Sequence, residues 1–129
     1  YIQIHGTMTK EVYEQCTLPI LRAFNISNLE KLEKYEIKDK IKGYVFDSKN
    51  PGSGETFDWK LLDHIRQKQK TVIFLAGGID ENNVKRAISE VAPDVIDLSS
   101  AVEKVSKDGA FFGKDPEKVK TIITIVHGQ

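Results

Sequence analysis

The sequence predicts an α/β fold built on parallel strands, and three observations support this prediction. Five short runs rich in β-branched and aromatic residues each end in small or polar residues. A segment with a helix-capping residue or helical spacing follows each run, and the links are short. Strict βα alternation of this kind predicts a parallel sheet with right-handed crossovers. Five units leave two architectures open, a doubly wound open sheet and part of a (β/α)8 barrel.

The first two units are defined by alternation and by helix caps. Tyr1–Gly6 alternates apolar and polar residues and ends in glycine, which predicts a strand. Thr9 can cap the helix that follows. Residues 18–26 form the second strand, and Ser27-Asn-Leu-Glu30 is a capping box that begins a helix to about Glu36. The first helix is expected to end near Cys16 and to turn three residues inward, Val12, Tyr13 and Cys16.

The third unit begins with the apolar run Ile41–Asp47, which predicts a strand. Residues 48–56 are rich in turn formers, and Asp58 can cap the next helix. The side chains expected to face inward from that helix are Leu61, Leu62 and Ile65.

The last two units follow the same rule. Thr71–Ala76 is the fourth strand, Asp80 caps the next helix, and the fifth strand spans about Val95–Leu98. A loop rich in Lys, Gly and Phe then leads to Asp115-Pro116, which sets the N-cap and first turn of a helix that ends near Gly128. The helix after Asp80 carries apolar residues at helical spacing, namely Val84, Ala87, Ile88 and Val91.

Composition excludes several classes of function. The 129 residues make at most one domain, with 19 acidic against 19 basic side chains, so no net field attracts nucleic acid or a membrane surface. The apolar runs are far shorter than the roughly 20 residues that a membrane span needs. The single cysteine, Cys16, suits a reducing cytoplasm. The chain starts at Tyr1 directly in a strand-like run, so we expect a segment upstream.

Ligands of both architectures bind at the carboxyl ends of the strands. The best signal there lies within Thr71–Ala101, where two consecutive strands end in Gly77-Gly78 and Ser99-Ser100. Small residues leave backbone N–H groups accessible, which is how α/β proteins hold a phosphate. The alternative for Gly77-Gly78 is a tight turn into a capped helix. The other strand-end candidates are His5-Gly6, Ala23-Phe24-Asn25 and Asp47.

Asp47 follows Tyr44-Val45-Phe46 at the end of the third strand. A carboxyl group among aromatic side chains can have a raised pKa and act as a general acid, but the residues alone slightly favour a loop-capping aspartate. The glycine loop Pro51–Gly54 can cover a substrate or form a long turn, and it lacks the Lys-[Ser/Thr] ending of a nucleoside triphosphate loop. Because no Cys, Asp or Glu lies at ligand spacing from a histidine, we expect no metal.

Together these residues resemble the phosphoribosylanthranilate isomerase family of tryptophan biosynthesis. The matching motifs, in the family's order, are Ile2-Gln-Ile-His-Gly6, Phe46-Asp47, Pro51-Gly-Ser-Gly-Glu-Thr-Phe-Asp-Trp59, Leu75-Ala-Gly-Gly-Ile79, Glu81-Asn-Asn-Val84, Asp97-Leu-Ser-Ser-Ala-Val-Glu103 and Lys114-Asp115. The resemblance implies a (β/α)8 TIM barrel of which residues 1–129 form a single partial domain. These residues correspond to strands four to eight, and the first three βα units are absent.

The resemblance also implies a reaction, the Amadori rearrangement of N-(5-phosphoribosyl)anthranilate to 1-(2-carboxyphenylamino)-1-deoxyribulose 5-phosphate, without cofactor or metal. Asp47 takes the position of the family's general acid, which reverses the preference for a loop cap. The substrate phosphate is expected at the backbone of four residues, Gly77, Gly78, Ser99 and Ser100. Four further residues are expected near the substrate, His5 by its anthranilate end, Ser53 and Gly54 in the loop over the site, and Asp97.

The family's general base is a cysteine at the end of the first barrel strand, and an arginine follows the second. Neither position exists in this chain, and Cys16 does not match the base because it lies in a helical segment. We therefore expect the isolated chain to be inactive and to need the missing segment or a complementing chain. Three departures from the family pattern are Pro51-Gly-Ser-Gly-Glu55 in place of Gly-Gly-Thr-Gly-Lys, Ala101 in place of glycine, and a longer loop at Lys104–Gly113.

Two rivals remain. One is a non-catalytic half-barrel that binds a phosphorylated ligand or associates with itself through open sheet edges. The other is the histidine-pathway isomerase, a phosphate-binding barrel with a similar rearrangement. That enzyme has an aspartate at the end of its fifth strand, where this chain has Asn25, which counts against it.

Overall fold

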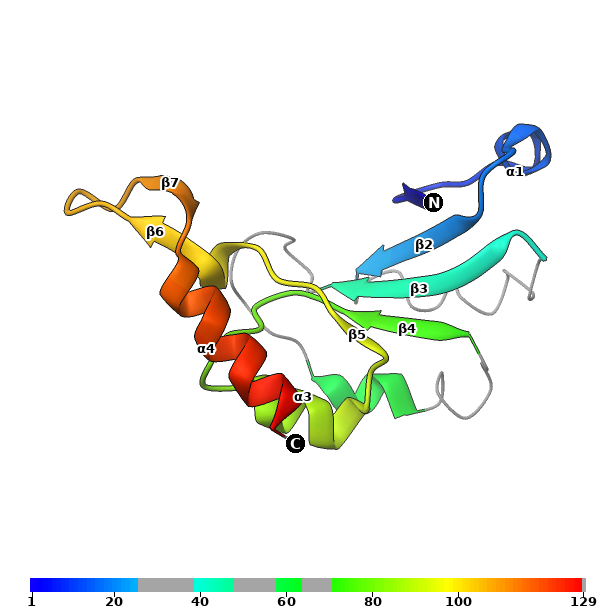
Figure 1. The fold of residues 1–129 in the computed structure, drawn as a ribbon. Helices are drawn as coiled ribbons and strands as arrows, with labels where there is room; N and C mark the ends of the chain where they lie inside the picture. Colours follow the sequence, from blue (N-terminus) through cyan, green and yellow to red (C-terminus); the bar gives the residue numbers. More distant parts are fainter. Residues whose placement is uncertain (26–38, 48–57, 64–70, 129) are drawn as a thin grey trace.

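The computed structural model describes residues 1–25, 39–47, 58–63 and 71–128. Its main feature is a parallel sheet in which the five strands lie in chain order (Figure 1). In a doubly wound sheet the order in which strands are added reverses at a switch point. Here each strand is added beside the one before it, as in a barrel. The strands are β1 (Ile2–Ile4), β2 (Ile20–Asn25), β3 (Ile41–Asp47), β4 (Val72–Leu75) and β5 (Val95–Ile96).

Three helical segments begin at the predicted capping residues Thr9, Asp58 and Asp115. Thr9 accepts a hydrogen bond from the Val12 N–H at 3.2 Å, and Asp115 accepts one from the Glu117 N–H at 2.9 Å. Asp58 caps a 3-10 turn, so the predicted helix begins in that form, and Ile65 lies outside the described residues. The predicted helix after Ser27 also lies outside them. The segments are α1 (Lys10–Gln15), η2 (Trp59–Leu62), α3 (Val84–Val91), η3 (Ser100–Val102) and α4 (Pro116–His127).

Two details of the helices differ from the prediction. Val12 is 47% exposed, because α1 has only six residues and its inner side is occupied by Tyr13 and Cys16. The predicted N-cap Asp80 lies one turn ahead of α3. Its carboxylate accepts hydrogen bonds from the N–H groups of Asn82 and Asn83, which shapes the entry to the helix.

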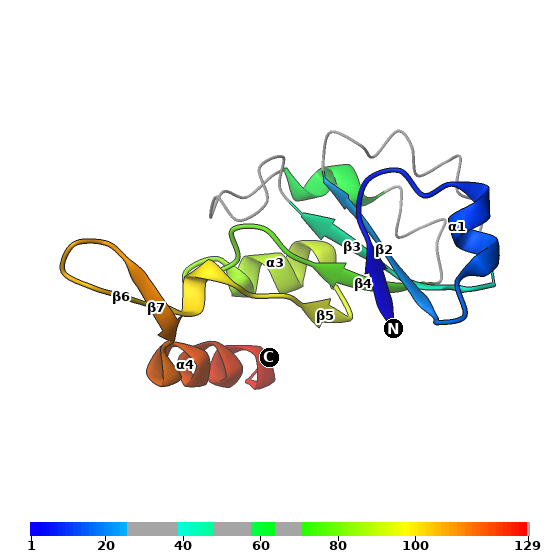
Figure 2. The ribbon, with the colours of Figure 1, turned by 90° about the horizontal axis from the view of Figure 1, so that it is seen from above.

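The segment predicted as a loop before the last helix contains an antiparallel hairpin, β6 (Glu103–Val105) and β7 (Phe111–Lys114). Figures 1 and 2 show it projecting away from the sheet. Gly109 closes the turn with φ 84°. The prediction was wrong because the turn signal Asp108-Gly109, between the short apolar stretches at Val105 and Ala110-Phe111-Phe112, is obscured by the polar residues Ser106 and Lys107.

The two faces of the sheet have different surroundings. One face carries Tyr44, Phe46 and Leu75 and packs against the helical segments, where Trp59, Leu62 and Val84 are also buried. The other face carries a smaller cluster of Ala23, Val45 and Ala76, with Leu21 and Phe74 at its margin. Val72 and Val95 lie on this second face and are 42% and 37% exposed.

Gly43 sits in the middle of that second face, between two larger side chains. A Cβ there would lie 3.0 Å from Leu21 Cδ2, 3.1 Å from Phe74 Cε2 and 3.2 Å from the Val72 carbonyl oxygen. Glycine therefore lets Leu21 and Phe74 close over β3.

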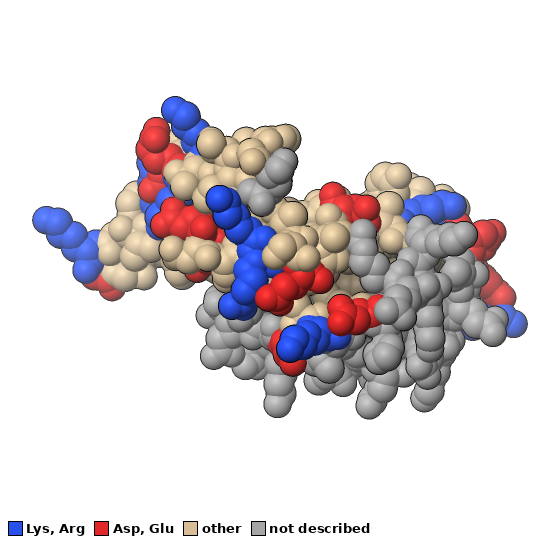
Figure 3. Space-filling view, turned by 90° about the horizontal axis from the view of Figure 1, so that it is seen from below, with Lys and Arg blue, Asp and Glu red and all other residues tan. Residues whose placement is uncertain are grey.

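Figure 3 shows one side of the molecule, on which Lys and Arg side chains are interspersed with Asp and Glu. This mixture agrees with the formal net charge of zero. Across the four described ranges, no helix has both the length and the apolar character to cross a membrane.

Candidate functional site

The site lies where the carboxyl ends of β3, β4 and β5 meet. Backbone hydrogen bonds extend the ladder past the strands, from the Ala76 N–H to the Phe46 carbonyl at 2.8 Å and from the Asp97 N–H to the Leu75 carbonyl at 2.9 Å. These bonds hold the residues that follow each strand at one edge of the sheet. Asp47, the last residue of β3, therefore lies beside the loop after β4.

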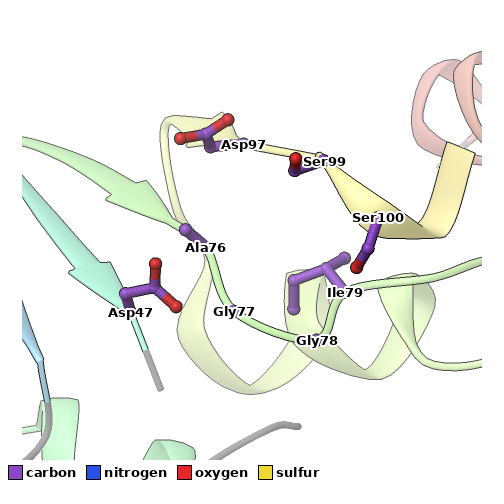
Figure 4. Close-up of a pocket in the computed structure, with 8 residues that line it drawn as sticks. All are labelled: Asp47, Ala76, Gly77, Gly78, Ile79, Asp97, Ser99 and Ser100. Carbon is purple, nitrogen blue, oxygen red and sulfur yellow. The ribbon is translucent and has the colours of Figure 1, made fainter. Parts of the chain in front are cut away.

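A pocket occupies this edge, and Figure 4 shows the Asp47 carboxylate directed toward the segment that contains Gly77. Six residues that the sequence placed at the site line this one pocket, although they are up to 53 positions apart along the chain (47 to 100). The lining residues are Asp47, Ala76, Gly77, Gly78, Ile79, Asp97, Ser99 and Ser100.

The two loops present backbone donors to the pocket. Gly77 and Gly78 have φ angles of 81° and 66°, a region that residues with a Cβ rarely adopt, so both positions require glycine. Within the described part of the chain, no protein acceptor takes the N–H groups of Gly77, Gly78, Ile79, Ser99 or Ser100. A cluster of N–H groups without protein acceptors at a concave edge is suited to an anion such as a phosphate.

The surroundings of Asp47 differ from the expectation. Strand alternation places Tyr44 and Phe46 on the helix-covered face, with ring centroids 6.3 Å apart, whereas Asp47 shares the opposite face with Val45. The aromatic neighbours in sequence therefore do not surround the Asp47 carboxylate. Asp47 is instead partly exposed at the pocket.

Of the three other predicted residues, His5 is described and does not line the pocket. His5 is exposed after β1, two strands away from β3, and its Nε2 lies 2.9 Å from Gln3 Nε2. Ser53 and Gly54 lie outside the described residues. Among the residues that are described, no group of three His, Cys, Asp or Glu side chains is placed to hold a metal ion.

Sequence reasoning missed the role of Arg22, which is 1% exposed in the middle of β2. Its guanidinium donates to the carbonyl oxygens of Ile4, at 2.6 Å, and Gly6, and lies 4.9 Å from the centre of the Phe24 ring. It therefore fastens the end of β1, which carries His5, to the sheet. The available signal was a charged residue inside an apolar strand, because such a residue is buried only when it is paired.

The chain matches the family described as N-(5'phosphoribosyl)anthranilate (PRA) isomerase over residues 1–124. It is 36% identical over 132 aligned residues to the N-(5'-phosphoribosyl)anthranilate isomerase of Syntrophomonas wolfei, which covers 99% of this chain and 61% of that protein. The crystal structure of phosphoribosyl anthranilate isomerase from Thermotoga maritima is also similar, with a TM-score of 0.73 at 30% identity over 98% of this chain and 61% of that one.

A further isomerase structure was solved in complex with reduced 1-(o-carboxyphenylamino)-1-deoxyribulose 5-phosphate. It has a TM-score of 0.70 at 26% identity, over 98% of this chain and 59% of that one. The 129 residues thus span about 60% of the length of these relatives. The five parallel strands in chain order match the corresponding part of these isomerase folds. The family match over nearly the whole chain shows that this protein belongs to the N-(5'-phosphoribosyl)anthranilate isomerase family.

Proposed function

We propose that this chain carries the phosphate-binding and general-acid half of an N-(5'-phosphoribosyl)anthranilate isomerase. The observation that carries the proposal is the pocket that joins Asp47 to the loops at Gly77-Gly78 and Ser99-Ser100. Family membership supplies the reaction, an Amadori rearrangement that needs a proton donor near the sugar ring and an anchor for the 5′-phosphate.

The arrangement suits a substrate held by its phosphate. The phosphate would accept hydrogen bonds from the N–H groups after β4 and β5, and the furanose ring oxygen is only a few bonds away from it. Neighbouring strands are about 4.8 Å apart, so a carboxyl group at the end of β3 is within reach of that oxygen. Asp47 would protonate the ring oxygen as the bond between C1′ and this oxygen breaks, which gives an open-chain Schiff base.

The second half of the reaction needs a general base. The base removes the proton from C2′, and the electrons of that bond form the C1′=C2′ double bond while those of the C1′=N double bond move to the nitrogen of the protonated Schiff base. The resulting enolamine tautomerises to the ketone. By the family pattern the base is a cysteine on the first barrel strand. We propose that residues 1–129 form one domain that supplies strands four to eight, and that the base comes from a segment or complementing chain outside them.

Two observations support the partial-barrel proposal. In the described residues β1 and β5 are the edge strands, and apolar side chains of the inner face at Val72 and Val95 are exposed. A closed barrel has no such edges. The relatives extend well beyond the matched part as well. We expect the assembled enzyme to work in the cytoplasm.

The test is isomerase turnover by the purified chain, alone and mixed with a polypeptide that contains the first three βα units of a relative. We expect turnover only in the mixture, and Asp47→Asn should lower kcat there by at least about 100-fold, the usual contribution of a general acid. Full turnover by the chain alone would contradict the missing base. Ligand binding without turnover in both samples would favour the non-catalytic half-barrel.

A further inference from the structure

A tether holds the loop after β4 from outside the pocket. The Asn83 side chain donates from Nδ2 to the Gly78 carbonyl at 2.8 Å, and its Oδ1 accepts from the Asp80 N–H at 2.9 Å. Asn83 is partly buried at the start of α3 and does not line the pocket. A single amide thus fixes the loop at two points, one on each side of Ile79.

The loop after β5 has a tether of the same kind, and the hairpin supplies it. Lys114 of β7 donates from Nζ to the Ser99 carbonyl at 3.0 Å and forms an ion pair with Glu103, its register partner on β6. The Glu103 side chain is only 18% exposed, and its backbone carbonyl accepts from Lys118 Nζ at 2.9 Å. Lys114 is therefore held in place, and it too lies outside the pocket lining.

Each tether has a consequence for the next amide in the chain. In a trans peptide the C=O and the following N–H share a plane and point in opposite directions. When Asn83 holds the Gly78 carbonyl, the Ile79 N–H points the other way. When Lys114 holds the Ser99 carbonyl, the same applies to the Ser100 N–H. Ile79 and Ser100 both line the pocket.

We propose that Asn83 and Lys114 are positioning residues that aim the Ile79 and Ser100 amides at the substrate phosphate. The proposal rests on the phosphate-binding role proposed above. It extends that role to the hairpin, which holds the loop after β5 through Lys114. Without the tethers, the Gly78 peptide can rotate and present its carbonyl oxygen to the phosphate, and the Ser99 carbonyl keeps only the longer hydrogen bond from the Val102 N–H, at 3.4 Å. Gly78 is especially free to rotate because it has no Cβ.

The first measurement concerns the tethers alone. The carbonyl ¹³C resonances of Ser99 and Gly78 should move upfield when their hydrogen bonds are removed by Lys114→Met and Asn83→Ala respectively. The matched controls are Lys107→Met, in the same hairpin, and Asn82→Ala, the neighbouring amide. Neither control side chain has a hydrogen-bond partner among the described residues, so neither should shift the two carbonyls.

The second measurement is titration of the full chain with inorganic phosphate. Each tether variant should bind phosphate about tenfold more weakly, the effect of one lost positioned hydrogen bond, and the controls should bind it unchanged. Lys114→Arg keeps the charge and a donor, so it should restore most of the affinity. Asn83→Asp keeps the bond from Asp80, loses the one to Gly78 and adds a negative charge, so Asn82→Asp is its control. Asn83→Asp should weaken binding more than Asn82→Asp does, even if Asn83→Ala unfolds.

Three results decide the matter. Weakened phosphate binding together with the carbonyl shifts supports the proposal. Because Asn83→Ala removes no charge, weaker binding by that variant cannot result from a lost charge. Tether variants that shift the carbonyls but bind phosphate within twofold of the unmodified chain would overturn it. An unmodified chain that binds no phosphate at all would instead overturn the phosphate role in the proposed function, and the positioning role with it.

Discussion

Replacing Arg22 by methionine should destabilise the protein more than replacing an exposed charged residue does. The substitution removes two hydrogen bonds from a charged donor to the carbonyls of Ile4 and Gly6 and leaves both acceptors without that partner. It also removes the cation–π contact with Phe24. Hydrogen bonds to charged groups contribute about 1.5–3 kcal/mol each, and a buried cation–π contact about 1–2 kcal/mol.

These contributions are offset by the cost of burying the guanidinium, which methionine avoids. We therefore expect Arg22→Met to lower the free energy of unfolding by about 2–4 kcal/mol, measured by urea denaturation followed by circular dichroism. The control is Lys10→Met. The Lys10 side chain is 84% exposed and pairs with Glu14 on α1, so its loss should cost less than about 1 kcal/mol. Equal effects of the two substitutions would refute the interpretation of Arg22 as a clamp on β1.

Two further predictions concern the sheet. Gly43→Ala should cost about 1–3 kcal/mol of stability in the same assay, because the Val72 carbonyl at 3.2 Å cannot move without shifting β4, and Leu21→Ala in the same chain should relieve part of that cost. Burial raises the pKa of the Tyr44 hydroxyl above 10.0, so the neutral form is favoured in the folded state. The associated stability is fully present below about pH 10 and is lost as the pH rises further. Tyr44→Phe should therefore lose less stability than the unmodified chain between about pH 8 and pH 11, and parallel losses would contradict this.

Periodicity and capping chemistry were enough to predict most of the fold. Ile41–Asp47 coincides with β3, and Thr9 and Asp115 cap their helices as expected, because both signals depend on residues close together in sequence. The choice between open sheet and barrel could not be made from periodicity, since it depends on the spatial order of strands. The resemblance to the isomerase family indicated the barrel.

The site was predictable where it depends on strand ends, and less so where it depends on contacts between distant segments. The loops at Gly77-Gly78 and Ser99-Ser100 follow consecutive strands, so their meeting follows from topology alone. The tether from Lys114 depends on the β6–β7 hairpin, a segment that the sequence pattern predicts as a loop. The buried position of Arg22 depends on carbonyl groups 16 and 18 residues away.

The proposed substrate site is tested most directly by locating a bound ligand on the chain. The reduced product analogue 1-(o-carboxyphenylamino)-1-deoxyribulose 5-phosphate can be titrated into ¹⁵N-labelled protein while backbone amide resonances are followed. We expect the largest shifts, with saturation, at the amides that line the pocket, namely Gly77, Gly78, Ile79, Ser99 and Ser100. Shifts confined to other parts of the chain, such as the hairpin turn at Lys107–Gly109, would contradict the claim that this edge of the sheet is the substrate site.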